Sequence, residues 1–467
     1  MATLTALLDL SQNALQASQA AIDITSNNVA NANTPGYTDE LAQWQESDSV
    51  TLSSHASSGQ GASVSSVSQR DLVLNQRVQQ QTQAGASLSA ESTALNELQS
   101  VFGLTSTSSA SASTAIGTDM DSFFNSFSAL EATPSSTALR QGVLNAAATL
   151  ATDFNSASSQ ISQQSGALNQ QVSGVVTQVN ALTQSIATLN LQIESASPTS
   201  DAGTLEDQRQ QDLSTLSGLV GFDQTRTENN GLTLTTANGA VLVSEGQSYA
   251  LGTATVGGNV DVVSAAGKDI TSGLTGGSLG GILQARDQDL PTVASALDTL
   301  AYAIGSAVNT QNAAGKDANG SPGGNLFTLP ASATGAASTI AVATMDPNAV
   351  AAAATGQGSS GGGNATALSN LASANLLDGQ TAAENYASLL TQLGSTASRV
   401  SGENATQQQS LTQLTTQQSS QSSVSLDQEA ANLTLYERSY DAAAKVFSIV
   451  DQLMAAALNL GEETTVT

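Results

Sequence analysis

Residues 4–37 of this chain read LTALLDLSQNALQASQAAIDITSNNVANANTPGY, and the pattern within them decides how the N-terminus folds. Large apolar residues alternate with small hydroxyl residues at spacings of four and three, which is the heptad pattern of a helix that packs along another helix. The apolar positions of this N-terminal seam are Leu4, Leu8, Leu15, Ile22 and Val29, and Ser11, Ser18 and Thr25 lie between them. The helix is predicted to stop at Thr34, because a residue before proline disfavours helix and Pro35-Gly36 suits the centre of a type II turn.

The C-terminus carries a matching seam with the same spacings of three and four. Its large residues are Leu433, Tyr436, Tyr440, Phe447, Val450 and Met454. Each stripe by itself also fits an ordinary amphipathic helix. Because both extreme ends carry one, we expect the two helices to pair with each other or with those of neighbouring subunits.

Between the ends, the pattern predicts a long-helix bundle interrupted by a small antiparallel β lobe. Helices are expected at about 71–102, 119–130, 147–197, 205–219, 278–312, 365–377 and 382–417. Residues 221–275 change to a period of two, punctuated by glycines and by the hairpin signal Asn238-Gly239, and are expected to form short strands. A Gly/Ser/Ala-rich insert at 315–363 contains one weak strand, 339–343.

These elements define a mainly α fold with a smaller β region (α+β, multidomain). We expect paired terminal helices, residues 1–40 with 422–467, to form a coiled-coil-like inner domain. Residues 41–220 with 276–421 are expected to form a helical middle domain, and residues 221–275 the β lobe. The aromatic content of 3% predicts that small side chains fill most of the core.

Composition excludes several classes of function. The 467 residues carry a net charge of −27, which disfavours nucleic acid and anionic membranes as partners. No run of apolar residues is long enough for membrane insertion. The chain has no cysteine, and Met1–Ser11 lacks the basic and apolar regions of a classical signal peptide, so secretion would use another route.

No constellation of catalytic or metal-binding residues emerges from the sequence. The single histidine, His55, cannot form a two-histidine metal site. Asp119 and Asp121 imitate a pair of catalytic carboxylates, but placement near the start of a helix explains them better. We therefore predict no catalytic residues, no metal site and no cofactor. A wall-cleaving enzyme would need a concentrated acid–base site, and a calcium-binding adhesin would need Asp- and Gly-rich repeats.

The turn region carries a resemblance to a known family. Asn28-Val29-Ala30-Asn31-Ala32-Asn33-Thr34-Pro35-Gly36-Tyr37 is similar to the signature shared by flagellar rod and hook proteins. Residues 61–103, 121–156, 205–221, 276–324 and 423–460 continue the similarity, and together they resemble the flagellar hook-associated protein 1 family. Within the signature we regard Asn28, Val29, Ala30, Asn31, Asn33, Thr34, Pro35, Gly36 and Tyr37 as an assembly motif.

The resemblance implies a non-enzymatic structural subunit at the junction between hook and filament, needed for filament assembly and motility. It implies export through the flagellar type III channel to the extracellular flagellum, without a cleaved signal peptide. Implied partners are further copies of the chain in a ring, the hook protein, the adjacent hook-associated junction protein, and an export chaperone at the C-terminal segment. The alternative within the same class is another rod or hook subunit.

Overall fold

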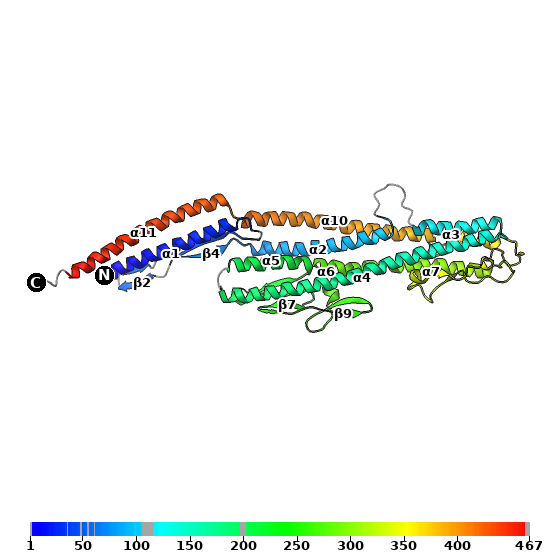
Figure 1. The fold of residues 1–467 in the computed structure, drawn as a ribbon, viewed down its shortest axis with the longest axis horizontal. Coiled ribbons are helices and arrows are strands. Elements are labelled where there is room, and N and C mark those ends of the chain that lie inside the picture. Colours follow the sequence, from blue (N-terminus) through cyan, green and yellow to red (C-terminus); the bar gives the residue numbers. More distant parts are fainter. Residues whose placement is uncertain are drawn as a thin grey trace.

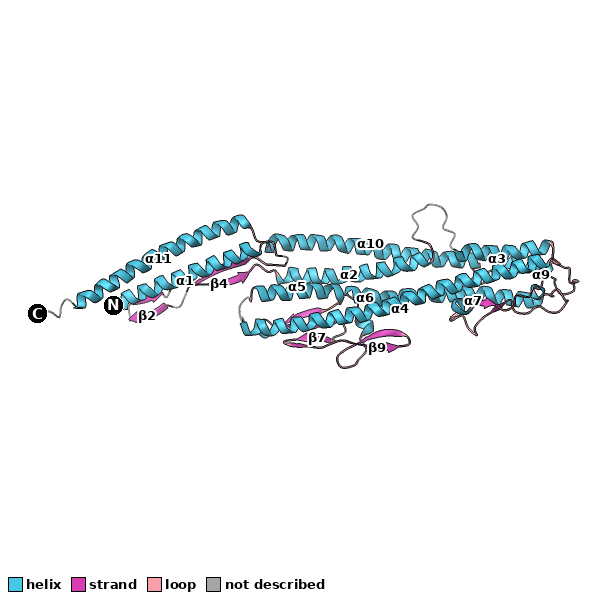
Figure 2. Ribbon diagram, in the orientation of Figure 1, coloured by secondary structure: helices cyan, strands magenta, loops and turns pink. Residues whose placement is uncertain are grey.

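The computed structural model describes residues 2–34, 36–46, 49–53, 56–59, 61–104, 115–196 and 202–462, and Pro35 and His55 lie outside them. The molecule is elongated, with an extended pair of helices at one end and a thicker helical body at the other (Figure 1). The first and last described residues, 2 and 462, lie at the far end of the helix pair (Figure 1). The expected mainly α fold with small antiparallel sheets is confirmed, and Figure 2 shows that the strands flank the helices.

The helix pair consists of α1 (Ala2–Asn31) and α11 (Leu426–Glu462), which pack against each other along their length. The small seam residues Ser11, Ser18 and Thr25 are buried, whereas the large ones, Leu4, Leu8, Leu15 and Ile22, are half-buried. Burial of the serines is possible because the Ser11 hydroxyl donates to Leu8 O (2.9 Å) and the Ser18 hydroxyl to Ala14 O (2.8 Å). The closest approach of α1 to its neighbours therefore runs along its small residues.

Two predicted seam residues are placed differently by the structure. Val29 is 44% exposed, and the adjacent Asn28 is buried in its place. On α11, Val450 is buried and Leu433, Tyr436, Phe447 and Met454 are half-buried, but Tyr440 is 37% exposed. The heptad pattern therefore predicts the wrong buried residue of α1 near the turn, where the polar contacts of Asn28 replace apolar packing of Val29.

The described residues between 40 and 68 form strands, whereas residues from 41 onward were expected in a helical middle domain. β1 (Glu40–Glu46) pairs antiparallel with β4 (Ala62–Ser68), and β2 (Ser49–Ser53) pairs with β3 (Ala56–Gly59). β1 and β4 pack on α1, so this segment belongs with the terminal helices. It was missed because β4 is rich in Ser and Ala, which carry little strand signal.

The body is built from long helices. α2 (Leu72–Val101), α3 (Ala115–Ala132), α4 (Thr137–Ala196), α5 (Thr204–Leu219), α6 (Gly277–Gln284), α7 (Leu290–Ala314) and α10 (Ala382–Ser422) are its main elements. α4 has 60 residues and begins ten residues earlier than expected, giving about 90 Å of helix. A π-helical turn, Ala285–Asp289, joins α6 to α7. Gly281 lets α6 approach α2, since a Cβ there would collide with Ser87 O.

The core of the body holds the largest buried side chains of the described residues. Phe123 packs edge-on against Phe127 and Phe327, with ring centroids 5.2 and 5.5 Å apart. These aromatic contacts join α3 to the insert, whose strands β11 (Phe327–Thr328) and β12 (Ala341–Val342) pair with each other. The strand expected at 339–343 is shorter, because Thr339 ends the short helix α8 (Ala336–Thr339). α9 (Gly363–Ser369) and a 3-10 turn, Asn370–Ser373, complete this end.

The predicted β region at 221–275 is present beside α4. β5 (Asp223–Arg226), β6 (Leu232–Thr235), β7 (Val241–Ser244) and β8 (Gln247–Ser248) form a four-stranded antiparallel sheet in that order. β9 (Gly252–Val256) and β10 (Asn259–Val263) form a separate hairpin. Gly239 takes a φ of +81° between β6 and β7, which fits the predicted Asn-Gly turn.

Candidate functional site: the joint between the terminal helices and the body

The predicted assembly motif lies where the helix pair meets the body. Among the described elements, no helix or strand of the terminal region packs extensively on a helix of the body. The connection instead runs through the turn after α1, through residues 69–71 before α2, and through residues 423–425 between α10 and α11. We call this region the joint.

Asn28 is the centre of the joint and is fully buried. Its Nδ2 donates to Asp39 Oδ1 (2.8 Å), to Glu40 O (2.8 Å) and to Glu429 Oε2 (3.1 Å). Its Oδ1 accepts from the Tyr37 hydroxyl (2.8 Å) and from Glu40 N (3.1 Å). One amide therefore ties together α1, the turn, the start of β1 and the first turn of α11.

Asp39 connects this network to the body. Its backbone N donates to Ser422 O at the end of α10 (2.9 Å), and its O accepts from Gln69 N (2.8 Å). Burial, followed by the charges of Glu429 and Glu40, raises the pKa of the Asp39 carboxyl to about 6. Burial, followed by nearby carboxylates of which Glu40 contributes most, also raises the pKa of the Tyr37 hydroxyl, which therefore stays protonated as a donor to Asn28.

An ion-pair clamp holds the other side of the joint. Arg70 Nη1 lies 2.5 Å from Glu206 Oε2, and Arg70 Nη2 lies 2.7 Å from Asp207 Oδ1, with all three side chains largely buried. Asp207 also accepts from the Thr38 hydroxyl (2.8 Å) and the Thr38 N (3.1 Å). Both carboxylates lie in the first turn of α5, where the helix dipole favours anions.

The clamp is anchored in the body through Arg209. Its Nη1 donates to Asn190 Oδ1 on α4 (2.9 Å) and to Asn230 O in the β lobe (2.7 Å). The start of α5 is therefore bonded to α4 and the β lobe on one side. On the other side it is bonded to Thr38 and Arg70, which lie next to β1 and α2.

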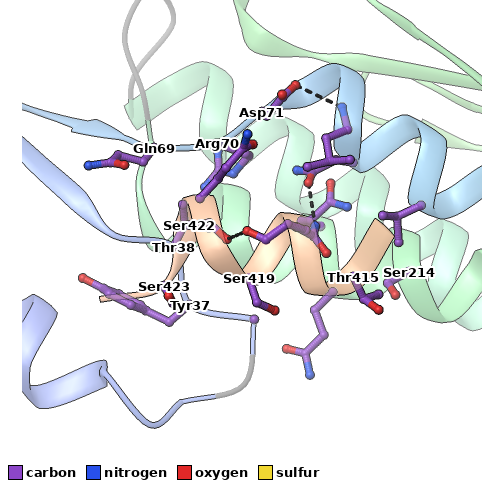
Figure 3. Close-up of a pocket in the computed structure, with 18 of the residues that line it drawn as sticks. Tyr37, Thr38, Gln69, Arg70, Asp71, Ser214, Thr415, Ser419, Ser422 and Ser423 are labelled. Atoms are coloured by element: carbon purple, nitrogen blue, oxygen red, sulfur yellow. Dashed lines mark hydrogen bonds between the residues drawn. The ribbon is translucent and has the colours of Figure 1, made fainter. Parts of the chain in front are cut away.

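A cleft of about 650 Å³ opens beside the joint, between the turn and the helices α2, α5 and α10. Figure 3 shows Thr415, Ser419 and Ser422 along one wall, with Tyr37 and Arg70 nearby. Most lining groups are hydroxyls and amides, and Asp71 is occupied in capping α2 by accepting from Val73 N and Leu74 N. Among the described residues, the lining therefore offers hydrogen-bonding groups and no paired acid and base suited to catalysis.

The remaining motif residues surround this network. Ala30, Asn33, Thr34 and Gly36 are exposed, and Asn31 is half-buried. Gly36 has a φ of +83°, and Tyr37 N donates to Thr34 O (3.2 Å), as expected where a glycine occupies the third position of a type II turn. Of the described motif residues, only Asn28 and Tyr37 enter the buried network.

Sequence reasoning missed the polar residues of the joint around these two. They are Asp39 and Glu429, which bond Asn28, and Arg70, Glu206 and Asp207 of the ion-pair clamp. The only signals were indirect, namely the unusual Thr38-Asp39-Glu40 after the turn and the Asp207-Gln208-Arg209 stretch.

The two carboxylates singled out in the sequence, Asp119 and Asp121, lie on α3. α3 begins at Ala115, so Asp119 and Asp121 do not lie in its first turn as expected. Asp119 instead bonds the carboxyl of Asp153, and burial followed by this contact raises the pKa of Asp153 to about 6.

In the described residues, no group of three or more His, Cys, Asp or Glu side chains is arranged to hold a metal ion. Within the same residues, no helix combines the length and the apolar character that a membrane span requires.

Comparison with known proteins defines the class first. Residues 8–38 match the family described as flagella basal body rod protein, and residues 416–460 match the flagellar basal body rod FlgEFG protein C-terminal family. These two segments contain most of the helix pair and its side of the joint. The fold and the joint are therefore those of a flagellar axial protein, a structural component and not an enzyme.

The middle of the chain defines the particular family. Residues 95–327 match the flagellar hook-associated protein FlgK helical domain. The chain is 31% identical over 344 residues to flagellar hook-associated protein 1 of Escherichia coli, covering 70% of this chain and 60% of that protein. It is 27% identical to the Bacillus subtilis protein of the same name, over 97% of both chains. The chain belongs to the flagellar hook-associated protein 1 family.

A solved structure supports the fold. The flagellar hook junction protein FlgK from Burkholderia pseudomallei superposes with a TM-score of 0.67 at 21% identity, covering 75% of this chain and all of that one. The chain spans only 60% of the length of its Escherichia coli relative, whereas it spans nearly all of the Bacillus subtilis one.

Proposed function

We propose that this chain forms the junction between hook and filament of a bacterial flagellum and is needed there for filament assembly and motility. The observation that carries the proposal is the unpartnered outer side of the helix pair. Leu435, Val446, Ile449 and Leu453 of α11 are between 46% and 59% exposed, although the seam on the other side of α11 faces α1.

The energy available from this surface fits an assembly role. Full burial of such a side chain is worth about 1.5–3 kcal/mol, and because these four are already half-buried, covering them is worth about 3–6 kcal/mol per subunit. That amount stabilises a contact between subunits, provided the helices are already held in place. The joint supplies that order at one end of the pair, because Asn28 fixes α1 relative to α11.

The partners that follow from this role are further copies of the chain, the hook protein on one side and the adjacent hook-associated junction protein on the other. We also propose an export chaperone that recognises the C-terminal segment before export through the flagellar type III channel. The exposed apolar residues of α11 are the part of the described chain that such a chaperone would need to cover.

Deletion of the gene tests the proposal. We expect cells with hooks but no filaments and with filament subunit shed into the medium, and restoration by the wild-type gene. Ile449→Asp should restore poorly, whereas Val256→Asp should restore fully, because Val256 is equally exposed but lies in the β lobe. Normal filaments in the deletion strain would contradict the proposal, and loss of the hooks themselves would indicate a rod or hook subunit.

A further inference from the structure

A second, smaller pocket adjoins the cleft at the joint and shares Arg70, Asn75 and Gln210 with its lining. It has a volume of about 210 Å³ and lies between the first turn of α2, the helix α5 and the strand β5 of the β lobe. α2 and α5 contact each other, and Figure 1 shows the starts of both helices next to the joint. The volume is below the about 300–1,000 Å³ of pockets for drug-sized ligands, so the pocket suits a single side chain with its adjacent backbone.

The lining gathers positive charge in a chain that has little of it. The sequence contains 11 Lys and Arg residues against 38 Asp and Glu residues. Three of these cations, Arg70, Arg209 and Arg226, line the pocket. All three guanidinium groups approach one atom, Glu206 Oε2, at 2.5, 3.9 and 3.6 Å respectively. Because Arg70 holds this oxygen in a short contact, the oxygen cannot bond Arg226 equally well.

Arg226 is the cation of this pocket that is available to a ligand. Its side chain is 45% exposed, and its Nη2 lies 3.6 Å from Glu206 Oε2, which is too long for a hydrogen bond. Among the described residues, the Arg226 guanidinium forms no hydrogen bond. A guanidinium carries five N–H donors in a planar fork that matches a carboxylate. A ligand carboxylate would therefore give Arg226 the paired contact that Glu206 does not provide.

The pocket also contains an acceptor that lacks a donor. Gln224 lies two residues before Arg226 on β5, so the two side chains are on the same face of the strand. Gln224 Oε1 is buried and has no hydrogen-bond partner among the described residues. A peptide N–H would satisfy this oxygen, whereas a simple anion such as acetate would not. The two side chains together fit a peptide that carries an acidic residue.

Apolar side chains complete the lining. Leu72 and Val73 are 44% and 61% exposed at the start of α2, and Val73 is the most exposed large apolar side chain in the described part of the chain. The buried Leu213 and Leu232 also line the pocket. A ligand with an apolar residue beside its carboxylate would remove this surface from water.

We propose that this pocket binds a peptide segment of a partner protein in which an Asp or Glu stands beside a large apolar residue. The ligand carboxylate contacts Arg226, a backbone N–H of the ligand donates to Gln224 Oε1, and the apolar side chain covers Leu72 and Val73. The pocket is lined by the body and by Arg70, with no residue of α1 or α11. The inference is therefore independent of the proposed role at the junction.

Titration of the purified full chain tests the site. The probe is N-acetyl-glutamyl-leucinamide, and the readout is the NMR spectrum of isotope-labelled Leu and Val methyl groups. The signals of Leu72 and Val73 should shift and saturate at roughly millimolar probe. The uncharged N-acetyl-glutaminyl-leucinamide and sodium acetate should each bind about tenfold more weakly, or less. No saturable shift, or equal binding of either comparison compound, would overturn the proposal.

Two substitutions assign the contacts. Arg226→Gln should weaken binding of the probe about tenfold. Arg77→Gln removes the same charge from an exposed position of α2 outside the pocket lining and should have no effect. Val73→Ser should weaken binding of the probe about threefold but leave N-acetyl-glutamyl-glycinamide unaffected. The methyl spectrum also shows that each variant is folded. Equal weakening by Arg226→Gln and Arg77→Gln would reduce the effect to general charge attraction and refute the site.

Discussion

Replacing Asp39 by asparagine should stabilise the terminal region at high pH and destabilise it at low pH. The substitution keeps the shape of a side chain that is 6% exposed and removes its charge. Asp39 Oδ1 accepts from Asn28 Nδ2 (2.8 Å), and Asp39 Oδ2 accepts from Gln69 Nε2 (3.3 Å). Glu429 and Glu40 are the charges that oppose its ionisation.

The magnitude follows from the shift in pKa. The pKa of Asp39 rises from its ordinary value of 3.8 to about 6 in the folded chain. At about 1.4 kcal/mol per pKa unit, the ionised carboxylate costs the folded state about 3 kcal/mol. Asparagine avoids this cost but turns an N–H toward one of the two donors, which loses a hydrogen bond worth about 1 kcal/mol. Asp39→Asn should therefore gain about 2 kcal/mol at pH 8.

The sign reverses on acidification. Because the folded-state pKa is raised, the wild-type chain is relieved of the charge cost below pH 3.8 and bears it fully above pH 6. At pH 4 the wild type still bears about 0.5 kcal/mol of this cost, so the variant, which has lost a hydrogen bond worth about 1 kcal/mol, should be about 0.5 kcal/mol less stable. The two stability curves should therefore cross between these pH values.

The single tryptophan of the chain makes the measurement local. Trp44 lies in β1, with its ring centroid 6.1 Å from that of Tyr436 on α11, so its fluorescence reports on the terminal region. Urea titrations at pH 4 and pH 8 give the two free energies, and Asp23→Asn serves as a control because Asp23 is exposed on α1. An equal loss of stability in Asp39→Asn at both pH values would refute the electrostatic argument.

Three further predictions concern the separate parts of the molecule. Arg70→Ala removes the nearest cation from the buried carboxylates Glu206 and Asp207, although Arg226 (3.6 Å) and Arg209 (3.9 Å) remain beside Glu206, and should cost about 3 kcal/mol. Arg70→Lys should recover only part of this loss in the same urea titration. Full recovery would show that simultaneous contact of the two guanidinium nitrogens with Glu206 and Asp207 is unimportant. Phe123→Ala opens the aromatic core of the body and should lower the free energy of opening of α3 and α4, measured by amide exchange, by about 3–5 kcal/mol. The urea transition reported by Trp44 should stay unchanged, and an equal loss of stability there would mean that the terminal region and the body unfold as one unit. In the free monomer, amide protection should be weak over residues 4–22 and stronger toward the joint, and strong protection throughout would show that the pair is stable without neighbours.

The helices were predictable because their signals are local and periodic. The seam of the long helix α4 and the stretch at 205–219 appear as apolar residues at regular spacings, and the structure places helices there. The bounds were less accurate where polar helices carry no period. The first ten residues of α4 were missed in this way, as were the serine-rich strands before Arg70, whose pairing depends on contact with α1.

The joint was not predictable beyond its turn. Asn28 and Glu429 are 401 residues apart, and Thr38 and Asp207 are 169 apart, so no window of sequence contains both members of either contact. Isolated Asn, Asp and Arg residues fit solvated loops equally well. What turns them into a network is burial, which requires each polar group to find a partner and so fixes their positions mutually.

The distribution of burial explains why the polar network lies at the joint and the apolar surface at the free ends. In the described parts of α1 and α11, Val450 is the only large apolar side chain that is fully buried, whereas the body buries whole clusters of Phe and Leu. A helix pair with so little core cannot hold its own geometry, yet it must reach its neighbours in a defined direction. Directional contacts through Asn28, Asp39 and Arg70 provide that direction without an apolar core, because buried hydrogen bonds and ion pairs specify angles that apolar packing leaves loose. In the proposed assembly, the exposed side chains of Leu435, Val446, Ile449 and Leu453 on α11 therefore stay uncovered in the single chain and become buried against another copy.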